Sequence, residues 1–427
     1  MVIHNLLPGK FYKLPHFIMQ PTSTRLGVIK PLRFNLHVDA NEQLAYKGSC
    51  EKSFYKRESA CSLALLSYMH KLNRVSLVRC QYITDKSLRF LSKLPHLRYL
   101  SLNRCYDISD EGIKHICRIA LQSLFLDCTS ISNNALEYIK EIDSLQYLSL
   151  HYCDVDKKGL QHLHSMSLKY LSLEDCSLTN EDLQPLSSLS NLEYLNLEGN
   201  NNLSEKAMHY IKDLPLKSLI LRQAYVDEKS AEILSNMSTL EEVVVWGKGA
   251  IRHLHRLPNL KSINLFGYEE LLKYLPNFSH VETLYLNTRD TTDDALAKLK
   301  DFSNLQELIL DSAIDITDEG VGRLGGLTTL TKLSLFALVY VTDATIDTLC
   351  NLKNLEHLNL AFTKISDDGL QKLSCLKKIK YLSLRGCSNV KNKDFAHVKS
   401  MFPLLEELNL CCRHCTEGPG FWLKEEI

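Results

Sequence analysis

One apolar pattern recurs along most of this 427-residue chain and constrains its fold more than any other feature. The pattern is Leu-x-x-Leu-x-Leu, as at Leu97, Leu100 and Leu102, and its last two leucines alternate with polar residues. Such alternation is typical of a short strand with one buried face. The first apolar residue of each unit lies at position 72, 97, 121, 145, 168, 192, 216, 240, 260, 281, 305, 330, 355, 379 or 405. Fifteen units in this register predict a repeat array.

A second signal follows most of the expected strands. A Ser or Thr stands between an aliphatic residue and Asp or Asn, as in Ile108-Ser109-Asp110. Ser or Thr at this point is typical of a helix N-cap, because its side-chain oxygen accepts from backbone N–H groups of the first turn. Each unit is therefore predicted as strand, turn and helix. Since no unit can bury its own apolar face, the units should stack into a curved solenoid with parallel strands inside and helices outside.

These repeats resemble the leucine-rich-repeat superfamily, and in particular its cysteine-containing subclass. The resemblance rests on Ile-[Thr/Ser]-Asp-x-Gly-Leu strings, such as residues 365–370, and on cysteines three places after the last strand leucine: Cys80, Cys105, Cys153, Cys176 and Cys387. It implies an α/β fold, a leucine-rich-repeat solenoid shaped as a curved horseshoe with about fifteen repeats. We expect the cysteines to be small buried side chains in the turn, as Thr129, Asn200 and Thr363 are at equivalent positions.

The first 71 residues break the repeat. They contain ten Lys and Arg against four Asp and Glu, so this segment carries a formal charge of +6 and the rest of the neutral chain −6. Four prolines in the first 31 residues argue against long helices there. We predict a basic non-repeat segment over residues 1–58, with one short strand near Leu36. A capping helix over residues 59–71 and the solenoid over residues 72–427, with an atypical last unit, should follow.

Exposed strand positions predict an interaction surface on the inner face. Three tyrosines occupy the same position on consecutive strands and should stack at the strand spacing of about 4.8 Å. Clustered exposed aromatic residues are enriched in interfaces, although an aromatic ladder can also simply support strand pairing. The predicted partner-binding residues of this face are Tyr147, Tyr170, Tyr194, Arg222, Trp246, Phe266, Tyr285 and Phe336. The charges of the face lean acidic, which disfavours a nucleic-acid partner.

Two units are shorter than the others. Those starting at 240 and 260 lack the Ser/Thr-Asp signal, and their outer segments, residues 250–257 and 269–275, have room for only a turn or two of helix. We expect the curvature to change there. Because Trp246 and Phe266 should be neighbours in these units, with Tyr285 beside them, this stretch is the predicted centre of the partner site.

Motifs for chemistry are scarce. The sequence contains no G-x-S-x-G, H-E-x-x-H or Walker-type glycine-rich loop. Cys412 and Cys415, within the cluster of residues 411–415, have the spacing of a zinc-ligand pair, but no second pair lies nearby to complete a structural site. We therefore expect no catalytic residues, no cofactor and no metal site.

The features together favour a non-enzymatic protein-protein interaction scaffold that binds a partner protein on its concave face. Cysteine-containing leucine-rich repeats occur in F-box proteins, the substrate receptors of SCF-type (cullin-RING) ubiquitin ligases. The resemblance therefore implies an alternative function, a substrate-recognition adaptor whose partners are ubiquitin-ligase components. Leu14-Pro15-His16-Phe17 lacks the acidic residue of an F-box opening, and prolines follow it. That alternative therefore requires a divergent N-terminal docking segment. A bacterial effector acting on host proteins, and an enzyme with its chemistry in residues 1–71, are further alternatives.

The sequence also bears on location. No apolar run of about 18 residues predicts a membrane span. The 14 cysteines are dilute and the chain opens without a secretion-type segment. We expect a reduced, intracellular protein, in the cytoplasm or nucleus, or in the host cytosol if it is an effector.

Overall fold

The computed structural model describes residues 70–80, 83–246, 251–266, 273–286, 291–391 and 395–410, together with Leu63 and two short strands before it. The chain divides into two compact units, residues 1–224 and 225–427. Both are built from the same strand-turn-helix repeat, which makes each an α/β leucine-rich-repeat solenoid. None of the helices in the described part of the chain has the length and apolarity that a bilayer crossing requires.

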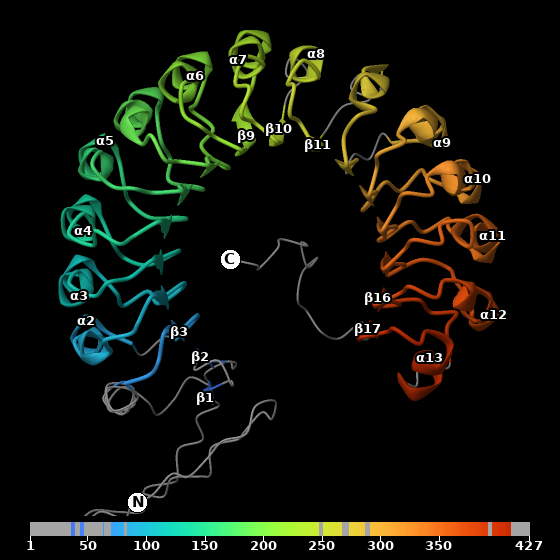
Figure 1. Ribbon diagram of the computed structural model, residues 1–427, viewed down its shortest axis with the longest axis horizontal. Coiled ribbons are helices and arrows are strands. Elements are labelled where there is room, and N and C mark those ends of the chain that lie inside the picture. Colours follow the sequence, from blue (N-terminus) through green and yellow to red (C-terminus); the bar gives the residue numbers. More distant parts are fainter. Residues whose placement is uncertain are drawn as a thin grey trace, which may run out of the picture. The chain divides into compact units, whose positions relative to one another are not determined.

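In the first unit, parallel strands form one layer and helices the other (Figure 1). The strands are β3 (Arg74–Ser76), β4 (Tyr99–Ser101), β5 (Ser123–Phe125), β6 (Tyr147–Ser149), β7 (Tyr170–Ser172), β8 (Tyr194–Asn196) and β9 (Ser218–Tyr225). The helices are α2 (Asp85–Leu88), α3 (Asp110–Ile116), α4 (Asn133–Ile139), α5 (Lys157–Leu160) and α6 (Glu205–Ile211), with 3-10 turns η1 (Leu91–Lys93), η2 (Gln161–Leu163) and η3 (Asn180–Ser188). Each strand pairs with the next in register, which aligns equivalent repeat positions.

A small hairpin precedes this layer. β1 (Leu36–Val38) pairs antiparallel with β2 (Gln43–Tyr46), and β2 pairs parallel with β3. The predicted strand near Leu36 is confirmed, whereas β2 was not predicted. Leu63 is helical and 2% exposed. The other residues of the predicted 1–58 segment and most of the predicted capping helix lie outside the described residues.

The second unit repeats the same two layers. Its strands are β10 (Glu242–Trp246), β11 (Ser262–Phe266), β12 (Thr283–Tyr285), β13 (Glu307–Ile309), β14 (Lys332–Ser334), β15 (His357–Asn359), β16 (Tyr381–Ser383) and β17 (Glu407–Asn409). Its helices are α7 (Glu228–Leu234), α8 (Ile251–Leu254), α9 (Asp293–Ala297), α10 (Asp318–Gly322), α11 (Ile346–Leu349), α12 (Asp367–Lys372) and α13 (Phe395–Met401). The 3-10 turns are η5 (Leu275–Phe278), η6 (Lys298–Asp301), η7 (Arg323–Gly326), η8 (Asp343–Thr345) and η9 (Leu373–Cys375).

The strand positions confirm the predicted repeat pattern in both units. Strands β3 to β17 each begin two residues after a predicted first apolar residue, and pattern leucines such as Leu97, Leu100 and Leu102 are fully buried. In the last unit Leu408 and Leu410 are only half-buried. The outer segment predicted over residues 250–257 holds little helix, as expected, since α8 has four residues. Most of the other short segment, residues 269–275, lies outside the described residues. The change of curvature expected there stays a prediction.

The cysteine positions complete the turns after the strands. Four of them, Cys105, Cys153, Cys176 and Cys387, are buried, and each thiol donates to a backbone carbonyl of the preceding repeat, as from Cys176 Sγ to Leu150 O at 3.1 Å. Burial raises the pKa of the first three thiols to about 12, so they stay protonated. The predicted turn role is confirmed for these four, and Cys80 is half-buried.

Asn200 fills the same turn position with more bonds than a thiol can make. Its Nδ2 donates to the carbonyls of Leu173 at 2.8 Å and Leu197 at 2.9 Å, and its Oδ1 accepts from Leu178 N at 2.9 Å. The side chain is fully buried. Asn200 therefore satisfies backbone groups of two successive repeats that have no access to water.

The Ser/Thr-Asp signal does more than cap helices. At Ser132, Thr317, Thr342 and Ser366 the hydroxyl accepts from a backbone N–H of the following helix, as predicted. The prediction is wrong for Ser109, whose side chain makes no such bond to α3. The Asp beside the Ser or Thr also reaches the next repeat: Asp318 accepts from Thr342 N at 2.7 Å and from Thr342 Oγ1 at 2.6 Å. We call this the aspartate ladder, which recurs in the pairs Asp85/Ser109, Asp110/Ser132, Asp293/Thr317 and Asp343/Ser366.

The glycine of the same string makes room for this ladder. A Cβ added at Gly369 would lie 2.0 Å from Asp343 Oδ1, and one at Gly320 would lie 2.0 Å from Asp293 Oδ1. A Cβ and a carboxylate oxygen that are not bonded to each other do not approach so closely, so a larger residue at either position would displace the carboxylate. The spacing of Ser/Thr, Asp and Gly in the string is therefore explained by contacts between repeats.

One pair of cysteines is bonded. Cys350 and Cys375 form a disulfide with a Cα–Cα distance of 5.9 Å. The expectation of reduced cysteines is wrong for this pair in the structure. The two residues lie 25 positions apart, about one repeat, so stacking of successive repeats brings their side chains together.

Candidate functional site

Three tyrosines form a row on the strand face of the first unit. Tyr147, Tyr170 and Tyr194 are the first residues of β6, β7 and β8 and are register partners. The ring centroids of Tyr147 and Tyr170 lie 6.2 Å apart, and those of Tyr170 and Tyr194 lie 4.3 Å apart with the rings nearly parallel. The predicted stacking is confirmed for Tyr170 and Tyr194, whereas the Tyr147 ring is tilted by 36° against that of Tyr170. We call these three residues the tyrosine row.

The aromatic surface extends beyond the predicted residues. Phe125 lies 6.4 Å from Tyr170 and 5.2 Å from Tyr99, measured between ring centroids. The guanidinium carbon of Arg74 lies 3.5 Å from the Tyr99 ring centroid, within the range of a cation–π contact. Tyr99 was missed as a site residue although it occupies the same strand position as the tyrosine row. Its position as the first residue of a strand was the signal in the sequence that could have identified Tyr99 as a site residue.

A row of acidic side chains follows the strand ends beside the aromatic surface. It comprises Asp127, Glu174, Asp175 and Glu198, which we call the carboxylate row. Asp127 follows β5, Glu174 and Asp175 follow β7, and Glu198 follows β8. The repeat brings these residues together because each lies after an equivalent strand. The predicted site residue Arg222 lies at its end, with its Nη2 2.5 Å from Glu198 Oε1.

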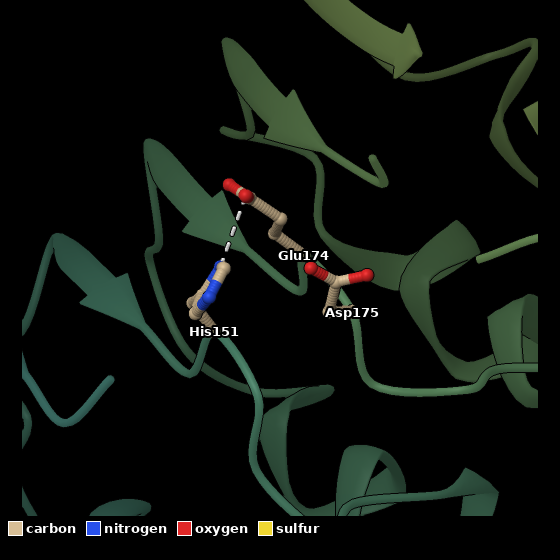
Figure 2. A group of neighbouring side chains, drawn as sticks. All are labelled: His151, Glu174 and Asp175. Atoms are coloured by element: carbon tan, nitrogen blue, oxygen red, sulfur yellow. Dashed lines mark ion pairs between the residues drawn. The ribbon is translucent and has the colours of Figure 1, made fainter. Parts of the chain in front are cut away.

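His151 stands within the carboxylate row. Its Nδ1 lies 3.1 Å from Glu174 Oε1, and Figure 2 shows the ring directed at that carboxylate, with Asp175 next along the chain. Its backbone N–H donates to Asp127 Oδ1 at 3.1 Å. Asp127 also accepts from Ser149 Oγ at 2.5 Å. His151 therefore contacts carboxylates that follow the strands on both sides of it, Glu174 through the imidazole and Asp127 through the backbone.

These contacts shift the titration of the surface. The hydrogen bond to Glu174 raises the pKa of His151, with burial opposing it. Burial alone would raise the pKa of Glu174, but hydrogen bonds from His151 and Asn196 outweigh it and the pKa is lowered. Burial, aided by the negative charge of Asp127, raises the pKa of Tyr170 to about 12. The phenol therefore stays neutral.

The same cluster contains atoms that could serve as metal ligands. His151, Glu174 and Asp175 offer one imidazole nitrogen and two carboxylate oxygens within 4.8 Å of one another. Such a mixed set suits a divalent transition metal. The sequence had predicted no metal site, and it did not single out this group because its members come from successive repeats. The Cys411–Cys415 cluster, including Cys412, lies outside the described residues.

The other predicted site residues belong to the second unit. Trp246 and Phe266 are register partners on β10 and β11, which confirms that they are neighbours, although their side chains lie outside the described part of the structure. Tyr285 is half-buried, and burial together with the charge of Glu307 raises its pKa to about 12. Phe336 packs edge-on against Phe362 at 5.4 Å. The predicted residues that the described contacts gather into one surface are therefore those of the first unit.

We expect the His151 imidazole to titrate above the usual value of about 6.5. Its ion pair with Glu174 stabilises the folded state fully below that unfolded-state pKa, and the contribution is lost as the pH rises through the raised folded value. Glu174→Gln should move the His151 pKa back toward the ordinary value. Histidine-selective NMR titration, with assignment by His151→Gln, measures the change; an unchanged His151 pKa in Glu174→Gln would show that the ion pair does not form.

Comparison with known proteins agrees with this repeat architecture. The family model described as Leucine Rich repeat matches residues 93–117, 164–187 and 351–374. No curated protein matches the sequence.

Several solved structures resemble the chain. A leucine-rich-repeat protein of Leptospira interrogans is 18% identical over 80% of this chain and 85% of its own, with a TM-score of 0.41. The internalin InlF of Listeria monocytogenes is 17% identical over 84% and 96%, with a TM-score of 0.39. A chain of the yeast Rad7 and Elc1 complex is 15% identical over 86% and 92%, with a TM-score of 0.43. Likenesses this distant carry no information about partners. The family match and the fifteen strand-turn repeats together identify the chain as a leucine-rich-repeat protein.

Proposed function

We propose that this chain is a non-enzymatic scaffold that binds a partner protein on its strand-bearing face. The observation that carries the proposal is the tyrosine row, in which three rings are held side by side by strand register. Tyrosine supplies a large contact area and is enriched in interface hot spots. Rings that are already ordered lose little conformational freedom on binding, so more of the contact energy remains as affinity.

The rings also support strand pairing, so a test must separate binding from stability. Tyr170→Ala with Tyr194→Ala removes the closest pair of the row. Tyr138→Ala with Tyr210→Ala is a matched control, because it removes two half-buried tyrosines from helices α4 and α6. We expect the affinity of the first variant for the main partner to fall at least about tenfold, which corresponds to about 1.4 kcal/mol. Affinity capture should then recover correspondingly less of that partner. The control should capture it normally.

Quantitative mass spectrometry of the captured proteins gives the measurement, and circular dichroism confirms that both variants are folded. Equal capture by the wild-type chain and by the folded Tyr170/Tyr194 variant would contradict the proposal. The predicted centre at Trp246 and Phe266 is tested by the same capture with Trp246→Ala plus Phe266→Ala. Loss in that variant alone would place the partner on the second unit instead.

The alternative roles place different demands on the chain. A ubiquitin-ligase adaptor needs a docking segment in residues 1–58, and a bacterial effector is defined by the partner it acts on. No contact in the described ranges favours either role or an enzyme. Co-purification of a cullin adaptor through the N-terminal segment would favour the ligase role.

A further inference from the structure

We infer that the partner segment bound by the first unit is basic, and that one of its arginine or lysine side chains lies between the tyrosine row and the carboxylate row. The inference rests on the proposed function, since it names the chemistry of the partner that the same face would bind. It commits to a protein segment with cationic side chains.

The chain itself shows that both rows accept a guanidinium. At the β3 end of the aromatic surface, Arg74 lies over the Tyr99 ring at 3.5 Å. At the β9 end of the carboxylate row, Arg222 contacts Glu198 Oε1 through both Nε and Nη2 at 2.5 Å. Each contact uses the strand position that the rows repeat along the sheet. The same chemistry is therefore available at the equivalent positions between these two ends.

The middle of the surface carries an excess of negative charge. Asp127, Glu174 and Asp175 lie there, and within the part of the chain that the structure describes no Lys or Arg forms an ion pair with any of them. His151 is the cation that faces Glu174, and it is charged only when protonated. The row as a whole holds four carboxylates against Arg222 and His151. An added cation would therefore improve the charge balance of this face.

The aromatic rings lie close enough to share such a ligand. The negative charges of Asp127 and Glu174 both act on the Tyr170 hydroxyl, which places the tyrosine row beside the carboxylate row. Between the rows, the last residues of β6 and β7 are the buried small residues Ser149 and Ser172. A cation with an aliphatic stem can pack on the rings and direct its charge to the carboxylates, as in cation–π recognition.

The test uses the full chain and two fluorescein-labelled probe peptides of equal length, one with three arginines spaced by Gly and Ser and one with glutamates instead. Glu174→Gln plus Asp175→Asn removes two charges from the row while leaving oxygen acceptors in place. Glu137→Gln plus Glu141→Gln is the control, since it makes the same change of net charge at two exposed residues of α4 and its end. Fluorescence anisotropy at about 0.1 M salt limits long-range attraction.

We expect the arginine peptide to bind the wild-type chain and the control alike, and the Glu174/Asp175 variant at least about tenfold more weakly. Equal binding of the arginine and glutamate peptides, or equal weakening in both charge variants, would overturn the inference.

Partner capture separates this inference from the proposed function. If the captured partner is lost with Tyr170→Ala plus Tyr194→Ala but kept with Glu174→Gln plus Asp175→Asn, the inference fails and the proposed function stands. If neither variant loses the partner, both fail. If both variants lose the partner and the Glu137/Glu141 control captures it normally, the inference and the proposed function are both supported.

Discussion

Replacing Asn200 by alanine is expected to lower the free energy of unfolding of the first unit by about 3 to 5 kcal/mol. The side chain is fully buried and bonds the carbonyls of Leu173 and Leu197 and the N–H of Leu178. Alanine would leave these backbone groups buried without partners, at a cost of about 1 to 3 kcal/mol each. Neighbouring losses do not add fully, so the expected total is below their sum.

Asn200→Cys provides the comparison that the chain itself suggests. Cys176 makes the equivalent bond to the carbonyl of Leu150, so a cysteine at position 200 should restore one of the three lost bonds and about a third of the lost stability. Thermal melting of the full chain, followed by circular dichroism, ranks the variants. Hydrogen-exchange mass spectrometry over residues 168–203 shows whether the loss is local. Equal melting of wild type and Asn200→Ala would contradict the role given to this side chain.

Replacing Gly369 by alanine is expected to cost about 2 to 3 kcal/mol in the second unit. The new Cβ would lie 2.0 Å from Asp343 Oδ1, and the carboxylate would move away from Ser366 N and Ser366 Oγ. Hydrogen bonds to a charged group contribute about 1.5 to 3 kcal/mol each. The gain of about 1 kcal/mol from replacing a helical glycine by alanine offsets part of that loss.

Gly326→Ala is the matched control. Gly326 lies in η7 of the same unit, and a Cβ added there meets nothing within 4 Å. Its φ is not in the left-handed region, so alanine should be neutral or stabilise the unit by about 0.5 kcal/mol. Urea denaturation of both variants gives the comparison. If Gly369→Ala is as stable as Gly326→Ala, the aspartate ladder does not require glycine.

The strands could be predicted from the sequence because the leucine pattern sets both their spacing and their buried face. The turn role of Cys105, Cys153, Cys176 and Cys387 followed from the same register. The aspartate ladder could not be predicted, because it depends on how the helix start of one repeat meets that of the next. β2 lacks the leucine pattern altogether, so its pairing with β3 had no sequence signal.

In the candidate site, too, some contacts could be predicted from the sequence and others could not. Strand register predicted that Tyr147, Tyr170 and Tyr194 would stack, since equivalent positions become neighbours. The ion pair between His151 and Glu174 depends on side-chain directions after the strands end, which periodicity does not set. The Cys350–Cys375 bond could have been inferred, because the two cysteines lie about one repeat apart at equivalent positions.

The aspartate ladder also bears on how an array of this kind changes length. Its donor and acceptor belong to successive copies of one string, so every copy offers the same contact forward that it receives from behind. A duplicated copy inserted in frame finds a ready partner on each side, and a deleted copy leaves two ends that still match. Gene duplication can therefore lengthen or shorten such a protein by whole repeats without any new interface having to arise first.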